Sequence, residues 1–510
     1  MGVPPVDAGS ERRPVPRSAA ALSVVWAAPA MQETLAYSVP GAAALPRTGP
    51  LAEMLVELNR ERPPLARLRH DATVAFGPTM RVERFALGNG LKVLVLVDPS
   101  APVVCLQTWF GVGSRHERVG KTGIAHLFEH LMFGETESVA HGAFDRMLEE
   151  AGAETNAATF LDWTYYHTNL PKDALALTLR LEAERMARLV LRDPQVSSEK
   201  EVVANERRQR VDDDVDGAVS ELLYKEAFTK HAYGWPTIGW MEDIKGFTTE
   251  DCVEFYRTYY APNNAALVIV GDVALDEALR GVQDHYGAQE PSKIPVEEVC
   301  PEPPQIAERR AEVVKPTATH KVAIGYRAPA LGDFDHAPLA LLNEILFSGR
   351  SSRVHRALVQ EQEIASEVRG WVGSFRDPSL YDIYLSARGE HTGEALLAAL
   401  EPLLEAVRRA PVTEAELDRA KARIELSVLQ GLETVAGKAE QIGFYETVLG
   451  DPAALFERLA AYRRATVGDL LRVARRYLVS SARTVIHVIP DGTSDEDDED
   501  GTDAESEEAS

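Results

Sequence analysis

Residues 125–134 read AHLFEHLMFG, with two histidines four positions apart and a glutamate directly before the second. If this segment is helical, His126 and His130 lie on one face about one turn apart, where two imidazoles can hold one zinc ion. Glu129 precedes His130, so its carboxylate can reach a water molecule at that metal. The surrounding residues are apolar. Because unpaired buried polar groups are costly, this setting favours a metal site over two ordinary surface histidines.

The spacing H-x-x-E-H is the inverted form of a pattern typical of zinc proteases. A catalytic zinc ion needs three protein ligands and a water molecule, so a third ligand must come from elsewhere. The charged, periodic segment 197–211 is the expected source, because Glu199 and Glu206 are two helical turns apart on one face. A solvated acidic helix face is the alternative interpretation of that segment.

Composition excludes several classes of protein. A chain of 510 residues predicts two or more domains, and its formal net charge of −25 argues against nucleic acid as a partner. Residues 491–510 hold eleven acidic and no basic residues, so they predict a disordered acidic tail, and the rest carries −25 + 11 = −14. The three cysteines have no C-x-x-C spacing, so neither a disulfide framework nor a cysteine zinc site is expected.

The first 80 residues are expected to form an arm outside the folded part. Three arginines precede a short apolar run at residues 19–26, and Ala28-Pro29-Ala30 gives a small-x-small site typical of secretory signals. The apolar run is short, so a disordered Pro/Ala-rich arm is the alternative. Cytoplasmic and periplasmic locations therefore both stay open. No apolar run of about 18 residues predicts a membrane span.

Order is expected from residue 81, with a first domain at 81–290, a proline-rich and charged linker at 291–305 and a second domain at 306–490. The Asn89-Gly90 turn should join two strands within 85–97. Asp193-Pro194 is interpreted as the stop of a helix at 172–191. Strands are further expected at 103–112, 154–160, 165–170, 266–271, 321–327 and 381–387, and helices at 144–151, 197–211, 337–347, 394–409 and 413–434.

The pattern recurs in the second domain, which indicates an internal duplication. Residues 340–349 read ALLNEILFSG and match 125–134 without gaps at Ala, Leu, Glu, Leu and Gly. His126 corresponds to Leu341 and His130 to Ile345. The second copy therefore has apolar groups at both ligand positions, and this contrast supports a metal role for the two histidines.

The motif and Glu206 together resemble the zinc peptidases of the pitrilysin and mitochondrial-processing-peptidase type. Further similar segments are GSRHE at 113–117, N-A-x-T-x-x-D-x-T-x-Y at 156–166, YYAPNN at 259–264 and G-x-S-S-R at 349–353. The resemblance implies an α+β fold of two homologous domains, each an antiparallel-rich sheet packed with helices. It also implies that two such units enclose a chamber for short or unfolded peptides.

By this resemblance, His126, His130 and Glu206 would bind one Zn²⁺ ion. Glu129 would be the general base, and Glu199 would orient the ligands from behind them. Asn156 and Ala157 would lie on an exposed edge strand that binds substrate through backbone hydrogen bonds.

This sequence departs from the family pattern at one site. In the family, full activity commonly needs an arginine and a tyrosine from the half without zinc. Arg353 is retained and would contact substrate, but Ser366 occupies the tyrosine position. The hypothesis is a zinc metalloendopeptidase that forms a heterodimer with a homologous subunit, which supplies the tyrosine. Alternatives are that Tyr381 or Tyr384 substitutes, that activity is low, or that the chain is a non-catalytic scaffold or peptide-binding subunit.

Overall fold

The computed structural model describes residues 49–298 and 300–492, and these form two related halves. The first half contains α1 (Pro50–Leu58), β1 (Leu68–Phe76), β2 (Met80–Leu87), β3 (Lys92–Val97), β4 (Val103–Phe110), α2 (Ile124–Leu131), α3 (Ala143–Glu150), β5 (Glu154–Thr159), β6 (Thr164–Pro171), α4 (Leu175–Arg188), α5 (Asp193–Arg207), α6 (Val215–Ala227), α7 (Met241–Gly246), α8 (Thr249–Tyr259), β7 (Ala265–Gly271) and α9 (Leu275–Tyr286).

The second half begins after a segment without helix or strand in its described residues. It contains β8 (Arg309–Lys315), β9 (Lys321–Arg327), α10 (His336–Phe347), β10 (Ala365–Val372), β11 (Leu380–Ala387), α11 (Gly393–Arg409), α12 (Glu414–Gly431), α13 (Val435–Leu449), α14 (Ala454–Arg464), α15 (Val467–Tyr477) and β12 (Arg483–Pro490). The predicted mixture of helices and antiparallel-rich sheets is confirmed.

The first sheet has seven strands in the order β1-β2-β3-β7-β4-β6-β5. Only the β3–β7 pair is parallel. The predicted turn at Asn89-Gly90 joins β2 to β3, and Gly90 has φ +92°, a conformation that glycine adopts without strain. Strand β5 pairs with β6 alone and therefore forms one edge of the sheet.

The second sheet repeats the last five strands of the first. Its order β8-β12-β9-β11-β10 corresponds to β3-β7-β4-β6-β5, and its one parallel pair, β8–β12, corresponds to β3–β7. Helix α10 takes the place of α2, and Leu341 and Ile345, at the two ligand positions, are buried in the second core. The duplication read from two short segments therefore extends to strand order and direction.

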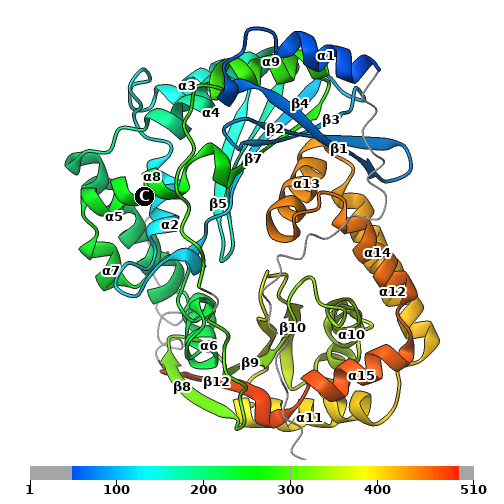
Figure 1. Cartoon of the computed structure of the whole chain (residues 1–510). Helices are drawn as coiled ribbons and strands as arrows, with labels where there is room; N and C mark the ends of the chain where they lie inside the picture. The colour runs from blue at the N-terminus through cyan, green and yellow to red at the C-terminus, as the bar shows by residue number, and fades with distance from the viewer. Residues whose placement is uncertain (1–48, 299, 493–510) are drawn as a thin grey trace, which may run out of the picture. The chain divides into compact units, whose positions relative to one another are not determined.

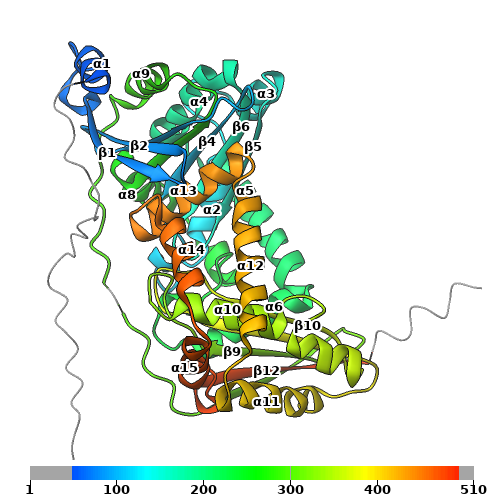
Figure 2. The same cartoon turned by 90° about the vertical axis from the view of Figure 1, so that its right-hand side faces the viewer.

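The halves exchange helices, as Figures 1 and 2 show for α6 and α13. Helix α13 of the second half packs on β4 and β7, where Ile442 lies beside Trp109 in a shared apolar cluster. Helix α6 of the first half packs on β9 and β12, where Leu223 joins Ile486. Each half therefore completes the apolar core of the other.

The prediction that the first 80 residues form an arm outside the folded part is wrong for residues 49–80. Strand β1 pairs along its length with β2, and α1 buries apolar side chains against the first core. The order of β1 arises from its pairing with the next strand, β2, and the order of α1 arises from packing against distant parts of the first core, including α9. Local composition reveals neither contact. Residues 1–48, including the signal-like segment, and residues 493–510 of the predicted acidic tail lie outside the described residues.

The helix stop predicted at Asp193-Pro194 is also wrong. Helix α4 already ends at Arg188, and Asp193 begins α5 with Pro194 in its first turn. Proline is favoured there because the first helical N–H groups have no partner within the helix. Among the described helices, none is both long and apolar enough to cross a membrane.

Candidate metal centre

Helix α2 presents both motif histidines from one face. Its apolar side chains, including Leu127 and Phe128, are buried in the first core and fix the rotation of the helix. His126 is 7% exposed. The rings of His126 and His130 lie with centroids 5.0 Å apart and planes at 77°. The i, i+4 spacing thus brings the imidazoles together, as predicted.

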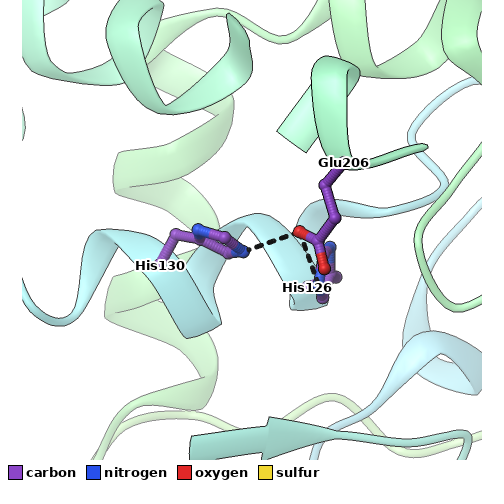
Figure 3. A group of neighbouring side chains, drawn as sticks. All are labelled: His126, His130 and Glu206. Carbon is purple, nitrogen blue, oxygen red and sulfur yellow. Dashed lines mark ion pairs between the residues drawn. The ribbon is translucent and has the colours of Figure 1, made fainter. Parts of the chain in front are cut away.

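Helix α5 packs against α2 and brings Glu206, shown in Figure 3, and Glu199 to the histidines. Glu206 Oε2 lies 3.2 Å from His130 Nε2 and 3.6 Å from His126 Nε2. Glu199 Oε2 lies 3.7 Å from the opposite ring nitrogen, His130 Nδ1. Glu206 therefore faces both imidazoles, and Glu199 approaches one of them from behind.

The three side chains fit a zinc ion. Ligand atoms about 2.0–2.2 Å from one tetrahedral zinc are roughly 3.3–3.6 Å apart, close to the two distances from Glu206. Glu206 Oε2 is buried without a hydrogen-bond partner, a costly arrangement that a bound cation would relieve. His126, His130 and Glu206 form the one His/Cys/Asp/Glu group found with this geometry in residues 49–298 and 300–492.

The charges around the histidines also suit a cation. Burial lowers the pKa of His126 to about 4, so this imidazole is neutral at pH 7, the state in which it can coordinate a metal. Burial alone would lower the pKa of His130 as well, but the carboxylates of Glu206, Glu129 and Glu199 raise it above its usual value. The contact with His130 lowers the pKa of Glu206, which keeps that carboxylate ionised.

Glu129 lies on the side of the cluster that faces the edge strand. Burial raises the pKa of its carboxyl group, although the neighbouring Thr159 and His130 act in the opposite direction. Thr159 is the last residue of β5. A raised carboxyl pKa moves this group toward the range that suits a general base. Sequence reasoning missed Thr159 as the neighbour of Glu129.

Asn156 and Ala157 both lie on edge strand β5, as expected. The Ala157 N–H donates to Asn156 Oδ1 at 2.8 Å and not to a neighbouring strand. This donor is therefore placed at the free edge, where a peptide could replace the side-chain acceptor. Beyond the end of β5 lies a cavity of about 540 Å³, whose lining includes the aromatic side chains of Phe160, Tyr224, Trp371, Phe375 and Tyr384.

The second half does not bring its predicted residue to the metal cluster. Arg353 forms two hydrogen bonds of 2.8 Å with the carboxylate of Glu416, and the hydrogen bonds from Arg353 lower the pKa of Glu416 to about 2. Ser366 Oγ donates within its own sheet to Ala387 O at 3.1 Å. Tyr381 is fully buried in the second core, whereas Tyr384 lines the cavity.

Comparisons with known proteins agree with this site. A family model described as Insulinase (Peptidase family M16) matches residues 92–239, which include all four motif residues. A model described as Peptidase M16 inactive domain matches residues 246–424. The second description agrees with the apolar residues that replace the histidines in α10.

Individual relatives carry matching names. Zinc protease PqqE of Helicobacter pylori is 32% identical over 415 residues, which cover 80% of this chain and 93% of that protein. Probable mitochondrial-processing peptidase subunit beta of Schizosaccharomyces pombe is 26% identical over 394 residues, covering 74% and 83%. The crystal structure of a protease from Helicobacter pylori superposes with a TM-score of 0.78 at 31% identity, covering 81% of this chain and 100% of the other.

Proposed function

Because the chain belongs to the insulinase family of peptidases, we propose that it is a zinc-dependent metalloendopeptidase that cleaves peptides or unfolded protein segments. The observation that carries the proposal is the buried Glu206 Oε2, which accepts no hydrogen bond and lies 3.6 Å from the Nε2 atom of His126 and 3.2 Å from that of His130. In this proposal residues 49–290 form the catalytic domain and residues 306–490 its metal-free companion.

The residues divide the chemistry among them. His126, His130 and Glu206 would hold the zinc ion, which supplies a Lewis acid that polarises a peptide carbonyl and lowers the pKa of water to about 7. Glu129 takes the proton from the attacking water and returns it to the leaving amine. Glu199 holds the His130 ring from its Nδ1 side, so that Nε2 faces Glu206.

The substrate site is proposed along the edge of the first sheet. An extended peptide would add to β5 as a further strand, with the Ala157 N–H as one backbone donor. A side chain beyond the end of β5 would then reach the aromatic cavity at Phe160. This arrangement selects extended chains, because a folded protein cannot offer a free strand to the edge.

Zinc removal tests the proposal. The purified chain is expected to contain one zinc ion and to lose peptide cleavage after dialysis against a chelator, because the ion supplies the Lewis acid. Adding back one equivalent of Zn²⁺ should restore cleavage. Metal analysis and a quenched fluorescent peptide library provide the measurements. Cleavage that persists in metal-free protein would refute the zinc mechanism.

The rival function is a non-catalytic scaffold or peptide-binding subunit. The inactive-domain description of the second half and Ser366 at the tyrosine position favour it. The retained Glu129 opposes it, since a scaffold has no use for a general base. A chain that binds zinc and extended peptides but cleaves none of them would support the rival.

We further propose that a homologous subunit completes the site. Arg353 is hydrogen-bonded to Glu416 and does not reach the metal cluster. Ser366 carries no phenol, and Tyr381 is buried in the second core. Of positions 366, 381 and 384, only Tyr384 therefore offers a candidate oxyanion donor. Co-expression with a homologous subunit that has the tyrosine should raise kcat by about 10²-fold or more, the usual value of one oxyanion donor. Equal cleavage by the chain alone and by the pair would contradict the heterodimer.

A further inference from the structure

The loop Gly113–Glu117, singled out in the sequence, takes no part in the chemistry proposed above. It follows strand β4, contains the 3-10 turn Ser114–His116 and leads toward α2. Its backbone and its side chains contact three separate parts of the molecule. Those parts are the end of edge strand β5, the first turn of the metal helix and the second half.

The first attachment joins the loop to the residues that follow β5. The Ser114 N–H donates to Phe160 O at 3.1 Å, and the Arg115 N–H donates to Leu161 O at 2.9 Å. A Cβ atom on Gly113 would lie 2.3 Å from Phe160 O, so only glycine permits this approach. The loop and the end of the edge strand therefore move together.

The second attachment joins the loop to α2. The buried carboxylate of Glu117 accepts the N–H of Gly123 at 2.9 Å and the N–H of Ala125 at 2.8 Å. These amides are among the first N–H groups of the helix, which lack partners within the helix. Ala125 directly precedes His126, so Glu117 holds the end of the helix from which the metal ligands project.

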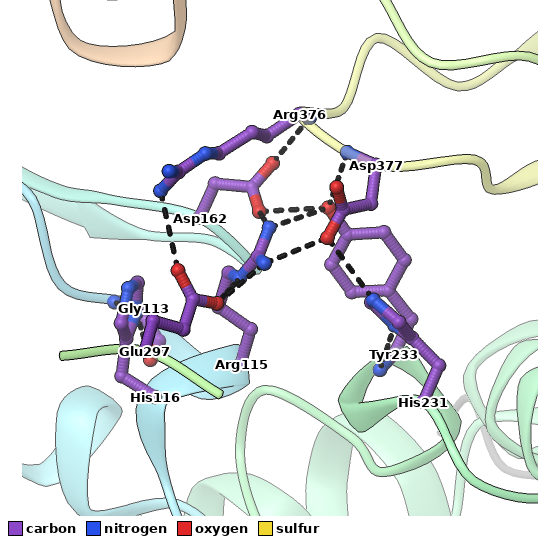
Figure 4. Close-up of polar contacts among 9 residues, drawn as sticks. All are labelled: Gly113, Arg115, His116, Asp162, His231, Tyr233, Glu297, Arg376 and Asp377. Atoms are coloured by element: carbon purple, nitrogen blue, oxygen red, sulfur yellow. Dashed lines mark hydrogen bonds and ion pairs between the residues drawn. The ribbon is translucent and has the colours of Figure 1, made fainter. Parts of the chain in front are cut away.

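The third attachment is a partly buried charge network, centred on the buried Arg115, that reaches the second half (Figure 4). Arg115, 8% exposed, donates from Nη1 to Asp162 at 2.9 Å, from Nη2 to Asp377 at 2.7 Å and from Nε to Glu297 at 2.7 Å. Asp377 lies between β10 and β11, and Glu297 lies in the segment between the halves. Asp162 also accepts the Arg376 N–H at 2.8 Å.

We propose that Arg115 and Glu117 are positioning residues that couple the placement of the second half to edge strand β5 and to metal helix α2. A shift of the β10–β11 connection must break the Arg115–Asp377 contact or displace the loop, and it also disturbs the hydrogen bond from the Arg376 N–H to Asp162. Since the loop is bonded to both β5 and α2, pulling it displaces the peptide-binding edge and the ligand helix together. The effect on cleavage rests on the proposed function, whereas the mechanical coupling does not.

The experiment removes the contact that the Asp377 side chain makes with Arg115, together with its 3.1 Å contact with His231 Nε2. Replacing the buried Arg115 would leave the buried Asp162 carboxylate without its cationic partner and endanger folding. The side chain of Asp377 is 25% exposed, and Asp377→Ala leaves Arg115 with two carboxylates. The matched control is Lys438→Met, which deletes the inter-half pair with Asp98 at 2.8 Å but touches no residue of the loop.

Hydrogen exchange of the whole chain is measured by mass spectrometry, together with zinc content and cleavage kinetics. Asp377→Ala is expected to speed exchange in β5 and the first turn of α2 and to lower kcat/KM by about 10-fold or more, with zinc retained. Asp377→Asn, which keeps the size but not the charge, should fall between it and the wild type. Lys438→Met should leave exchange in β5 and α2 unchanged.

Two results overturn the coupling. One is wild-type exchange in β5 and α2 of Asp377→Ala. The other is equal acceleration there by Lys438→Met, which would mean that any loosening between the halves has the same effect. If the chain cleaves no peptide but Asp377→Ala alone speeds exchange in β5 and α2, the coupling stands and the proposed function fails.

Discussion

Glu129→Gln is expected to lower kcat/KM for peptide cleavage by about 10²- to 10⁴-fold while zinc stays bound. The amide keeps the size of the side chain but cannot accept the proton of the attacking water. Because His126, His130 and Glu206 supply the ligand atoms, the metal content should equal that of the wild type. Steady-state cleavage kinetics and metal analysis of the same preparation test both parts.

The matched control is Glu201→Gln on helix α5. Glu201 is exposed and lies two residues from Glu199, so the change removes one negative charge near the site without touching the histidines. It should leave kcat/KM within about twofold, since exposed charges interact weakly through water. Unchanged cleavage by Glu129→Gln would mean that another group takes the proton.

The sequence pattern alone identified the two histidines, because they lie close together in the sequence. His130 follows His126 by four positions on one helix, so helical geometry alone brings the rings together. Helix geometry does not identify the third metal ligand in this way, because Glu199, Glu201 and Glu206 all lie on one charged helix. Only the resemblance distinguished Glu206, and the packing of α5 on α2 now places its Oε2 against both rings.

The two errors have different physical origins. Strand β1 reads LRHDATVAF, a mixed polar and apolar segment whose order depends on pairing with β2. Pro194 is compatible with the end of one helix or the start of the next, and only the structure shows that it lies in the first turn of α5. Similarly, the apolar faces of α6 and α13 do not reveal that each covers the sheet of the other half.

Glu206→Gln is expected to remove the zinc ion. An amide oxygen is a much weaker ligand than a carboxylate, and two imidazoles alone leave tetrahedral zinc one protein ligand short. The purified variant should therefore contain far less than one equivalent of zinc and should lose cleavage to the same extent. A readout independent of catalysis is thermal unfolding, since a ligand that binds only the folded state raises the unfolding temperature. Added zinc should stabilise the wild type and leave the variant unchanged.

Glu199→Gln separates a ligand from a supporting residue. Glu199 approaches His130 Nδ1 at 3.7 Å, on the side of the ring away from Glu206, so its loss should weaken zinc affinity by about 10- to 100-fold without abolishing binding. Competition with a chromophoric chelator measures the zinc affinities of Glu199→Gln, Glu206→Gln and the wild type on one scale. If Glu206→Gln binds zinc as tightly as the wild type, Glu206 is not the third ligand. If Glu199→Gln loses zinc as fully as Glu206→Gln, the two glutamates share the ligand role.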